Sequence, residues 1–206
     1  MLERKLTLKE QQLKLREDAI LDVVNRLLGE RGYESMTVDD VAAEVGIAKA
    51  SLYKHFDSKE ALAGAAMIRL LDRLTAHVAA LPVDMSAYEK LRETLRWTLQ
   101  IRMNGGLPLL PSNSPTLRNG LLANTAYLSR VLTLNEALLD LVERAKQDGK
   151  LAHGIPSDVA LFAIYARSCD PSIEYLRLTG QYSDNDIVQY LLATCFGGLL
   201  EPAARS

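Results

Sequence analysis

The sequence predicts an all-α protein of about nine helices. Apolar residues recur three and four positions apart along most of the chain, and no segment shows the sustained two-residue alternation of a strand. The 12 Gly and 7 Pro are gathered into a few short stretches, so long segments remain for helices. With 48% hydrophobic and 24% charged residues, the chain also has enough apolar surface to form a core.

The first helix is expected to begin at Thr7 and to run to about Glu30. Thr7 and Glu10 form a capping-box pattern, in which the Thr hydroxyl caps an early N–H and the Glu carboxylate reaches back to the cap. Gly32 is a suitable C-terminal stop, because glycine readily adopts the left-handed conformation that follows many helices.

Two short helices separated by a tight turn are expected next. Thr37 caps the first of them, and Gly46 permits the positive-φ turn that ends it. Residues 48–55 form the second, and the apolar Ile47 and Leu52 fill the angle between the two. This is the arrangement of a helix-turn-helix, in which two helices cross steeply around a short turn.

Longer amphipathic helices are expected after this motif, the first of them capped by Asp57. Pro115 opens another helical region at its first turn, and Asp170-Pro171 is expected to kink a later helix. The expected segments are 57–81, 86–103, 115–148 (with or without a break), 156–179 and 183–200. The change in helix length predicts an N-terminal domain of residues 1–60 and a C-terminal domain of residues 61–206.

The composition argues against several classes of protein. No apolar run reaches the roughly 18 residues of a membrane span, and the N-terminus has no apolar signal segment, so neither membrane insertion nor secretion is expected. Cys169 and Cys195 stand alone in apolar segments, which fits a reducing cytoplasm. His55, His77 and His153 lack ligand spacing and no catalytic motif is present, so we expect no enzyme, no metal and no cofactor.

Positive charge is confined to two places in the N-terminal part, although the net charge is −2. Residues 1–16 hold five basic and two acidic side chains, and residues 46–60 hold three basic and two acidic ones. Residues 17–45, in contrast, hold two basic and eight acidic side chains. Taken alone, this pattern is equally typical of solvated helix faces.

The second helix of the motif carries candidate DNA contacts, because a recognition helix presents its solvent-facing residues to the major groove. Lys and Ser side chains bond base edges or phosphates, Ala50 can lie against a thymine methyl, and Tyr53 can donate to a phosphate. Packing is the alternative role for Tyr53 and His55. Two further candidates lie at helix N-termini, where free N–H groups favour phosphate. The full candidate set is Thr37, Lys49, Ala50, Ser51, Tyr53, Lys54, His55 and Lys59.

The segment 16–62 resembles the TetR (tetracycline-repressor) family. The residues LYKHF at 52–56 and SKEAL at 58–62 match the family signature, and AKAS at 48–51 fits it too. Lys54 departs from it, since an aromatic residue is frequent there. The resemblance implies an all-α homodimer with one recognition helix per subunit, and a C-terminal domain that binds an effector and releases DNA.

The C-terminal domain is expected to hold both an effector pocket and the dimer interface. The expected pocket residues are Trp97, Ile101, Met103, Leu110, Tyr127, Tyr165 and Cys169. The dimer contact is expected from the last two helices, with Ile187, Leu191, Cys195 and Gly198 in the interface. For each of these residues, ordinary core packing is the alternative.

The expected function is therefore a DNA-binding transcriptional repressor. It would bind an inverted-repeat operator in double-stranded DNA as a homodimer and be released by a small, mainly apolar effector. An activator and a ligand-free architectural protein are the alternatives within DNA binding. A helical scaffold that binds only protein would explain the amphipathic helices, but not the basic residues that follow Gly46.

Overall fold

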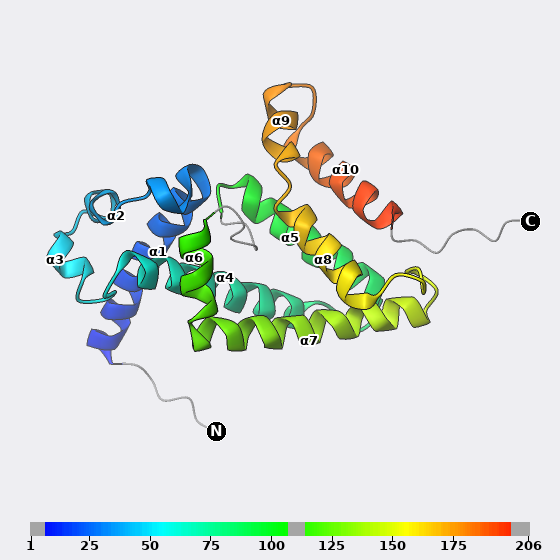
Figure 1. Cartoon of the computed structure of the whole chain (residues 1–206), viewed down its shortest axis with the longest axis horizontal. Coiled ribbons are helices and arrows are strands. Elements are labelled where there is room, and N and C mark those ends of the chain that lie inside the picture. The colour runs from blue at the N-terminus through cyan, green and yellow to red at the C-terminus, as the bar shows by residue number, and fades with distance from the viewer. Residues whose placement is uncertain (1–6, 107–113, 199–206) are drawn as a thin grey trace, which may run out of the picture.

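The computed structural model describes residues 7–106 and 114–198, and over these ranges it is all-α (Figure 1). The all-α prediction is confirmed, with ten helices in the described residues. They are α1 (Leu8–Ser35), α2 (Val38–Val45), α3 (Lys49–Leu52), α4 (Lys59–Ala80), α5 (Ala87–Met103), α6 (Pro115–Leu122), α7 (Thr125–Gln147), α8 (Ser157–Ser168), α9 (Ser172–Leu178) and α10 (Asp184–Gly197).

The first helix begins as its capping box predicts. The backbone N–H of Glu10 donates to Thr7 Oγ1 at 3.3 Å, and the backbone N–H of Thr7 donates to Glu10 Oε2 at 2.7 Å. Gly32 interrupts the helix with a φ of 75°, so the expected stop is present, and a short helical turn then continues to Ser35. The third helix is shorter than the predicted 48–55, because regular helix ends at Leu52 and turns follow.

Two predicted details of the later helices are corrected. Ser58, and not Asp57, caps α4, because its Oγ accepts the backbone N–H of Ala61 at 3.0 Å. The region 115–148 is divided into α6 and α7, since Asn124 caps a new helix by accepting the N–H of Tyr127 at 3.1 Å.

The helix predicted over 156–179 is also two helices, α8 and α9. The sequence correctly predicts an irregularity at Asp170-Pro171, but the helix breaks there completely, where only a kink is expected. Regular helix ends at Ser168, and Pro171 has no N–H to continue the ladder. Asp170 instead accepts the N–H of Ser172 at 2.8 Å through its Oδ1, which starts α9.

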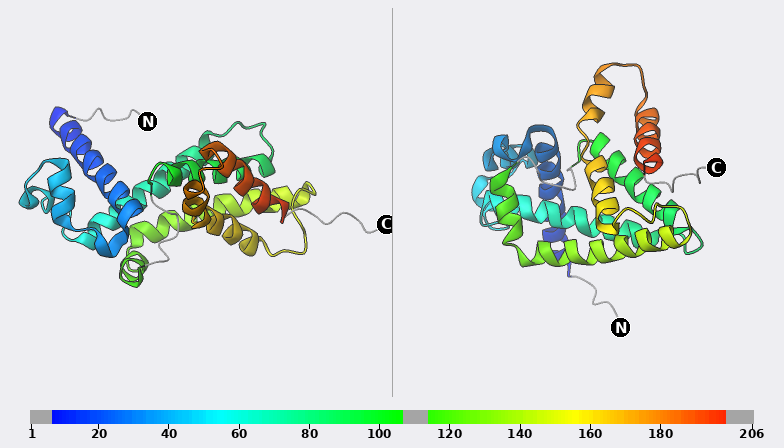
Figure 2. Two further views of the ribbon diagram at one scale, coloured as in Figure 1. Left: turned by 90° about the horizontal axis from the view of Figure 1, so that it is seen from above. Right: turned by 45° about the vertical axis from the view of Figure 1, so that its right-hand side comes forward.

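The helices form two regions joined by α4. Helices α1, α2 and α3 gather at one end of the molecule, around the start of α4 (Figure 1). In the other region α7 runs beside α4, and α5 packs against α7 and α8. The pair α9 and α10 projects from this body, with α10 resting on α5 and α8 (Figure 2).

A continuous apolar core runs through both regions. It begins at Ile20 in α1, passes along α4 through Leu62 and Leu74, and ends at Phe196 in α10. This core holds the N-terminal helices against the long helices that follow. No helix among the described residues is long and apolar enough to cross a membrane.

Candidate nucleic-acid interface and small-molecule cavity

The turn between α2 and α3 has the predicted helix-turn-helix geometry. Gly46 adopts the left-handed conformation, with φ 75° and ψ 33°, and the N–H of Ile47 donates to the carbonyl of Ala42 at 3.0 Å. Leu52 is buried against the core and Phe56 is partly buried there. These anchors turn the opposite side of α3, the recognition helix, toward solvent.

The exposed side of α3 and the turn that follows it carry most of the predicted contacts. Ala50, Tyr53 and Lys54 are exposed, and Ser51 is half-buried. Lys49 is also exposed, and its Nζ lies 2.8 Å from Asp39 Oδ2 of α2. This hydrogen bond to Asp39 raises the pKa of Lys49, so the side chain is a cation with an exchangeable partner.

Thr37 lies at the start of α2, where its hydroxyl serves as the cap. The backbone N–H of Asp40 donates to Thr37 Oγ1 at 3.1 Å, and that hydroxyl donates to Asp40 Oδ2 at 2.7 Å. These bonds from Thr37 lower the pKa of Asp40. A phosphate contact from Thr37 would therefore have to share the hydroxyl with the cap.

His55 is turned inward. Its side chain is only 7% exposed, and Nδ1 lies 3.3 Å from Glu17 Oε1 of α1. Its ring also lies beside that of Phe56. The structure thus favours packing over DNA contact for His55.

Lys59 lies at the junction of α1 and α4. Its Nζ is 4.3 Å from the ring centroid of Tyr33 and donates to the Glu34 carbonyl at 3.3 Å. The Tyr33 hydroxyl donates to Glu60 Oε1 at 2.7 Å, and burial together with this bond raises the pKa of Tyr33. The contacts hold the last turn of α1 against the start of α4, beside the recognition helix.

A small cavity of about 100 Å³ lies between α4, α7 and α8. Its walls are Leu71, Tyr127, Val131, Leu134, Asn135, Phe162 and Tyr165. The wall of the cavity includes one hydrogen-bonded pair of polar side chains, in which the Tyr165 hydroxyl donates to Asn135 Oδ1 at 2.7 Å. Burial raises the pKa of both Tyr127 and Tyr165, so both phenols stay neutral at physiological pH.

The cavity brings together only two of the seven predicted pocket residues, Tyr127 and Tyr165. Trp97 instead stacks on His77, with ring centroids 5.2 Å apart. Met103 is buried and Ile101 half-buried near the end of α5, Cys169 caps α8, and Leu110 lies outside the described residues. Phe162 and Asn135 were not predicted, because neither carries a local signal that would link α7 to α8.

The predicted dimer residues of α10 face their own chain. Ile187, Leu191 and Cys195 are 0%, 5% and 7% exposed, on the helix that rests on α5 and α8, and burial raises the pKa of Cys195. Gly198 is exposed after the last turn. A different set of apolar side chains on α8 and α10 is exposed, and it includes Val159, Phe162 and Tyr190.

The two regions of the molecule meet in a tight junction. A Cβ atom at Gly29 of α1 would lie 2.2 Å from the carbonyl oxygen of Gly105, so only glycine fits there. Arg102 of α5 donates to the Gly29 carbonyl at 3.5 Å and forms an ion pair with Glu174 of α9. Arg102 therefore touches both α1 and the projecting pair of helices.

The N-terminal segment matches a known family. Residues 20–66 fit the family model described as bacterial regulatory proteins, tetR family, and this range contains α2, α3 and the start of α4. Residues 20–66 thus form a TetR-family domain. The resemblance expected from residues 16–62 is confirmed.

Two curated relatives of this chain are regulators of transcription. The negative regulator IcaR of the biofilm operon in Staphylococcus aureus (strain Newman) is 50% identical over 46 residues. That match spans 22% of this chain and only 25% of IcaR. The transcriptional repressor KstR2 of Rhodococcus jostii (strain RHA1) is 25% identical over 91% of this chain and 92% of its own length.

A solved structure shares the fold over nearly the whole chain. The regulator FadR of Bacillus subtilis, in complex with stearoyl-CoA, superposes with a TM-score of 0.62. The match covers 88% of this chain and 98% of FadR at 16% identity, so it supports the architecture alone. The C-terminal region of this chain thus shares its helical architecture with FadR.

Proposed function

We propose that this TetR-family protein is a transcriptional repressor that binds an inverted-repeat operator as a homodimer and is released by a small, mainly apolar molecule. The observation that supports this most directly is the recognition helix. Its anchor Leu52 is buried, while Lys49 and Ala50 on the helix, and Tyr53 and Lys54 in the turn that follows, are exposed. In duplex DNA the major groove admits such a helix.

Lys49 is proposed as a base or phosphate contact that changes partners on binding. In the free protein it pairs with Asp39, and an exposed pair of this kind contributes about 1 kcal/mol or less. Replacing a single carboxylate by the dense negative charge of DNA is therefore favourable. Tyr53 and Lys54 would add phosphate contacts beside it, while His55 holds the end of the helix in place.

The homodimer is proposed to form through the exposed faces of α8 and α10. Val159 and Phe162 of α8 are 53% and 54% exposed, and Tyr190 of α10 is 51% exposed. The two helices are neighbours in the fold, so a two-fold axis would bring together the same apolar patch from each subunit. This keeps the predicted helices but moves the contact on α10 from the buried stripe of Ile187, Leu191 and Cys195 to its exposed side.

The effector is proposed to enter the cavity between α4, α7 and α8. Its walls are mainly apolar, and their polar groups are the Tyr165–Asn135 pair and the phenol of Tyr127, so a mainly apolar molecule with a hydrogen-bonding group fits best. The volume of about 100 Å³ is below the roughly 150 Å³ known to hold benzene, so a ligand would have to displace side chains.

The signal is proposed to pass through the junction at Arg102. A ligand that displaces α8 would also shift α9, which follows after a break of three residues, and with it Glu174. Arg102 would transmit this shift to the end of α1. The two recognition helices of a dimer would then no longer match successive major grooves.

The domain boundary is proposed to lie near residue 60, at the cap of α4. The protein is proposed to act in the cytoplasm, where its DNA lies.

The test is binding-site selection from random DNA duplexes with the purified protein. We expect an inverted repeat, with the logarithm of the affinity falling linearly with the logarithm of salt concentration. Lys49→Ala should change the preferred bases within each half-site by about 1–3 kcal/mol. The control, Lys150→Ala, removes an exposed lysine at the far end of α7 and should change nothing. Selection of no sequence, or of a single asymmetric half-site, would contradict the proposal.

A further inference from the structure

The first turns of α1 lie outside the family domain. The helix begins at Leu8, but the first residue that it buries is Ile20, which is also where the family match begins. Before that point Leu8 is 78% exposed, Leu13 is 51% exposed and Leu15 is 69% exposed. Packing in the hydrophobic core therefore does not explain why the helix has these first turns. We call them the α1 extension (residues 8–16).

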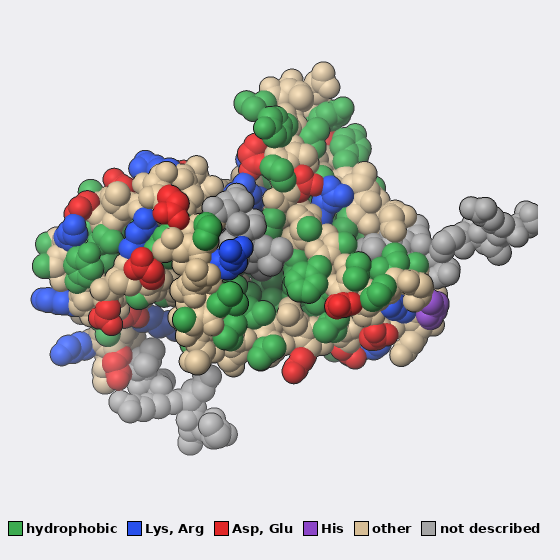
Figure 3. Space-filling model, in the orientation of Figure 1, with side chains coloured by type: hydrophobic (Ala, Val, Ile, Leu, Met, Phe, Trp, Pro, Cys, Tyr) green, Lys and Arg blue, Asp and Glu red, His purple; other side chains and the backbone are tan. Residues whose placement is uncertain are grey.

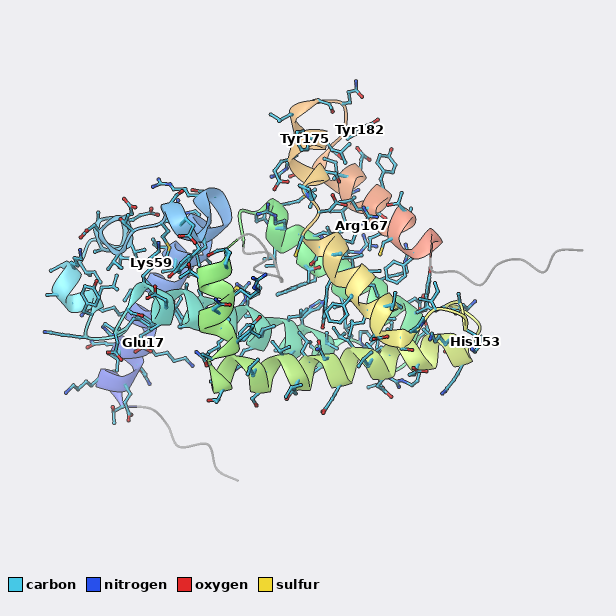
Figure 4. The ribbon with its side chains drawn as sticks, viewed as in Figure 1. Glu17, Lys59, His153, Arg167, Tyr175 and Tyr182 are labelled. Carbon is cyan, nitrogen blue, oxygen red and sulfur yellow. The ribbon has the colours of Figure 1, made fainter. Side chains whose placement is uncertain are left out.

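The α1 extension is fixed close to the recognition helix. Glu17, next to the extension, contacts His55, three residues after α3 ends. The neighbouring Asp18 pairs with Arg69 of α4, so the root of the extension is held on two sides. A helix rises 1.5 Å per residue, and Lys9 therefore lies about 12 Å beyond Glu17. Both Glu17 and the start of α1 lie at the α3 end of the molecule (Figure 4).

One face of the extension is a basic stripe. Lys9, Gln12 and Arg16 follow one another at spacings of three and four, so they share one side of the helix. They line a shallow groove together with Leu13 and Leu15. Basic side chains also stand out along the α3 end of the molecule in the space-filling view (Figure 3).

The acidic residues nearby have other partners. Glu10 is bound to Thr7 in the capping box, and Glu17 is bound to His55. Within residues 7–106 and 114–198, no ion pair joins Lys9 or Arg16 to a carboxylate. Their charge is therefore available to an external anion.

We propose that the basic stripe Lys9–Gln12–Arg16 binds phosphates of duplex DNA beside the bases read by α3. This rests on the proposed DNA-binding function and adds to it a second contact, outside the helix-turn-helix. Along the axis of α1, the extension spans about 12 Å from Glu17, which contacts His55, to Lys9, a length comparable to the roughly 12 Å width of the major groove. Phosphates along the groove edge are thus within its range.

A second copy of the chain or a lipid surface fits the extension less well. Leu8 and Leu15 lie on one side of the helix, but Leu13 lies about 160° around from Leu15 at 100° per residue. The leucines therefore do not make the single apolar stripe that a partner helix or a membrane interface requires. The stripe that does follow the helical spacing is the basic one.

The chain offers a matched control in Lys14. It is exposed and has the same charge, but it lies on the opposite side of the extension from Arg16. It shares that side with Asp18 and Asp22, which face Arg69 of α4. Arg16→Gln and Lys14→Gln therefore change the net charge equally while removing different contacts.

The experiment measures the salt dependence of affinity for a selected operator with flanking duplex. Each lost phosphate contact lowers the slope by about 0.9, so Arg16→Gln should lower it by about 1.8 in a dimer. Lys9→Gln should act similarly, Lys14→Gln should leave the slope unchanged, and base preference should stay the same in all three. Removing the flanking base pairs should abolish the difference between wild-type protein and Arg16→Gln.

Three outcomes would overturn the proposal. Equal slopes for wild-type protein and Arg16→Gln would show that the stripe makes no contact, and equal losses for Arg16→Gln and Lys14→Gln would show only general attraction. A change in oligomeric state in Arg16→Gln, seen by light scattering without DNA, would assign the extension to a second copy. Failure of the wild-type protein to select any DNA would instead refute the proposed function itself.

Discussion

The recognition helix and the cavity use polar side chains in opposite ways. At the recognition helix, the ion pair of Lys49 and Asp39 is open to solvent, with the two side chains 48% and 70% exposed. At the cavity, Tyr165 is 7% exposed and its hydroxyl is bonded to Asn135 inside an apolar wall. One site holds a charge that water already screens, and the other holds a neutral group that water does not reach.

This difference predicts how each site discriminates between ligands. An exposed pair is exchanged at little cost, so the recognition helix suits a polyanion that offers many weak contacts. A buried hydroxyl left without a partner costs about 1–3 kcal/mol, so the cavity suits a molecule that satisfies one specific hydrogen bond. The contrast can be tested from the largest expected effect to the smallest.

The largest effect is expected for charges placed on the two faces of the C-terminal helices. Leu191→Glu puts a charge into the core, where Leu191 is 5% exposed, and should cost about 3 kcal/mol or more of folding free energy. Val159→Glu changes a side chain that is 53% exposed, so it should leave the fold intact but separate the dimer. Circular dichroism and light scattering distinguish the two. If Val159→Glu is folded and still dimeric, the dimer interface does not include this face of α8.

A smaller effect is expected at the junction between the two regions. Gly29→Ala forces α1 and the turn after α5 apart, because its Cβ would lie 2.2 Å from a backbone oxygen, and should cost about 1–3 kcal/mol. DNA affinity should fall together with stability, since α1 belongs to the N-terminal region that holds the recognition helix. Gly154→Ala, at a position where a Cβ meets nothing within 4 Å, is the matched control in both assays. Equal melting temperatures for the two variants would refute the close contact.

The polar pair of the cavity should have a moderate effect. Tyr165→Phe leaves Asn135 Oδ1 without its donor and should cost about 1 kcal/mol of stability. The substitution should also change which ligands the cavity prefers. The affinity for compounds that carry a hydrogen-bonding group should fall more than the affinity for pure hydrocarbons. Titrating a panel of both kinds, with Tyr182→Phe on the exposed surface as control, measures this. An equal loss for both kinds would exclude the pair from ligand recognition.

The smallest effect is expected at the recognition helix. Asp39→Asn removes the exposed partner of Lys49 and should change the free energy of unfolding by less than about 1 kcal/mol. DNA affinity should rise, because Lys49 no longer has to leave a carboxylate. Gel-shift titration at several salt concentrations, with Asp140→Asn on α7 as control, tests this. A loss of affinity would show that Asp39 positions Lys49 for binding.

Local signals in the sequence account for much of what was predicted. The capping box of Thr7, the left-handed Gly46 and the irregularity at Pro171 act within a few residues, so each could be located before the fold was known, although a kink was predicted at Pro171 where the helix breaks. The recognition helix was found for the same reason, since its anchors and exposed residues lie within one short segment. The resemblance to the TetR family added the expectation of a dimer and an effector.

The predicted C-terminal site residues show the limit of such reasoning. Ile187, Leu191 and Cys195 do form one stripe, but periodicity alone cannot say whether that stripe faces its own chain or another. The same ambiguity affected Trp97, which stacks on His77 and does not line the cavity. An apolar side chain gives the same signal in a core, a pocket or an interface.

The sequence by itself determined most of the helical segments, several of their caps and the helix-turn-helix, because these depend on hydrogen bonds and φ angles within a few residues. Tertiary structure alone decided which faces are free. His55 meets Glu17 across 38 positions, and Arg102 meets Glu174 across 72, so no local pattern announces either pair. Burial, and with it the choice between a packed and a binding residue, arises only when distant segments come together.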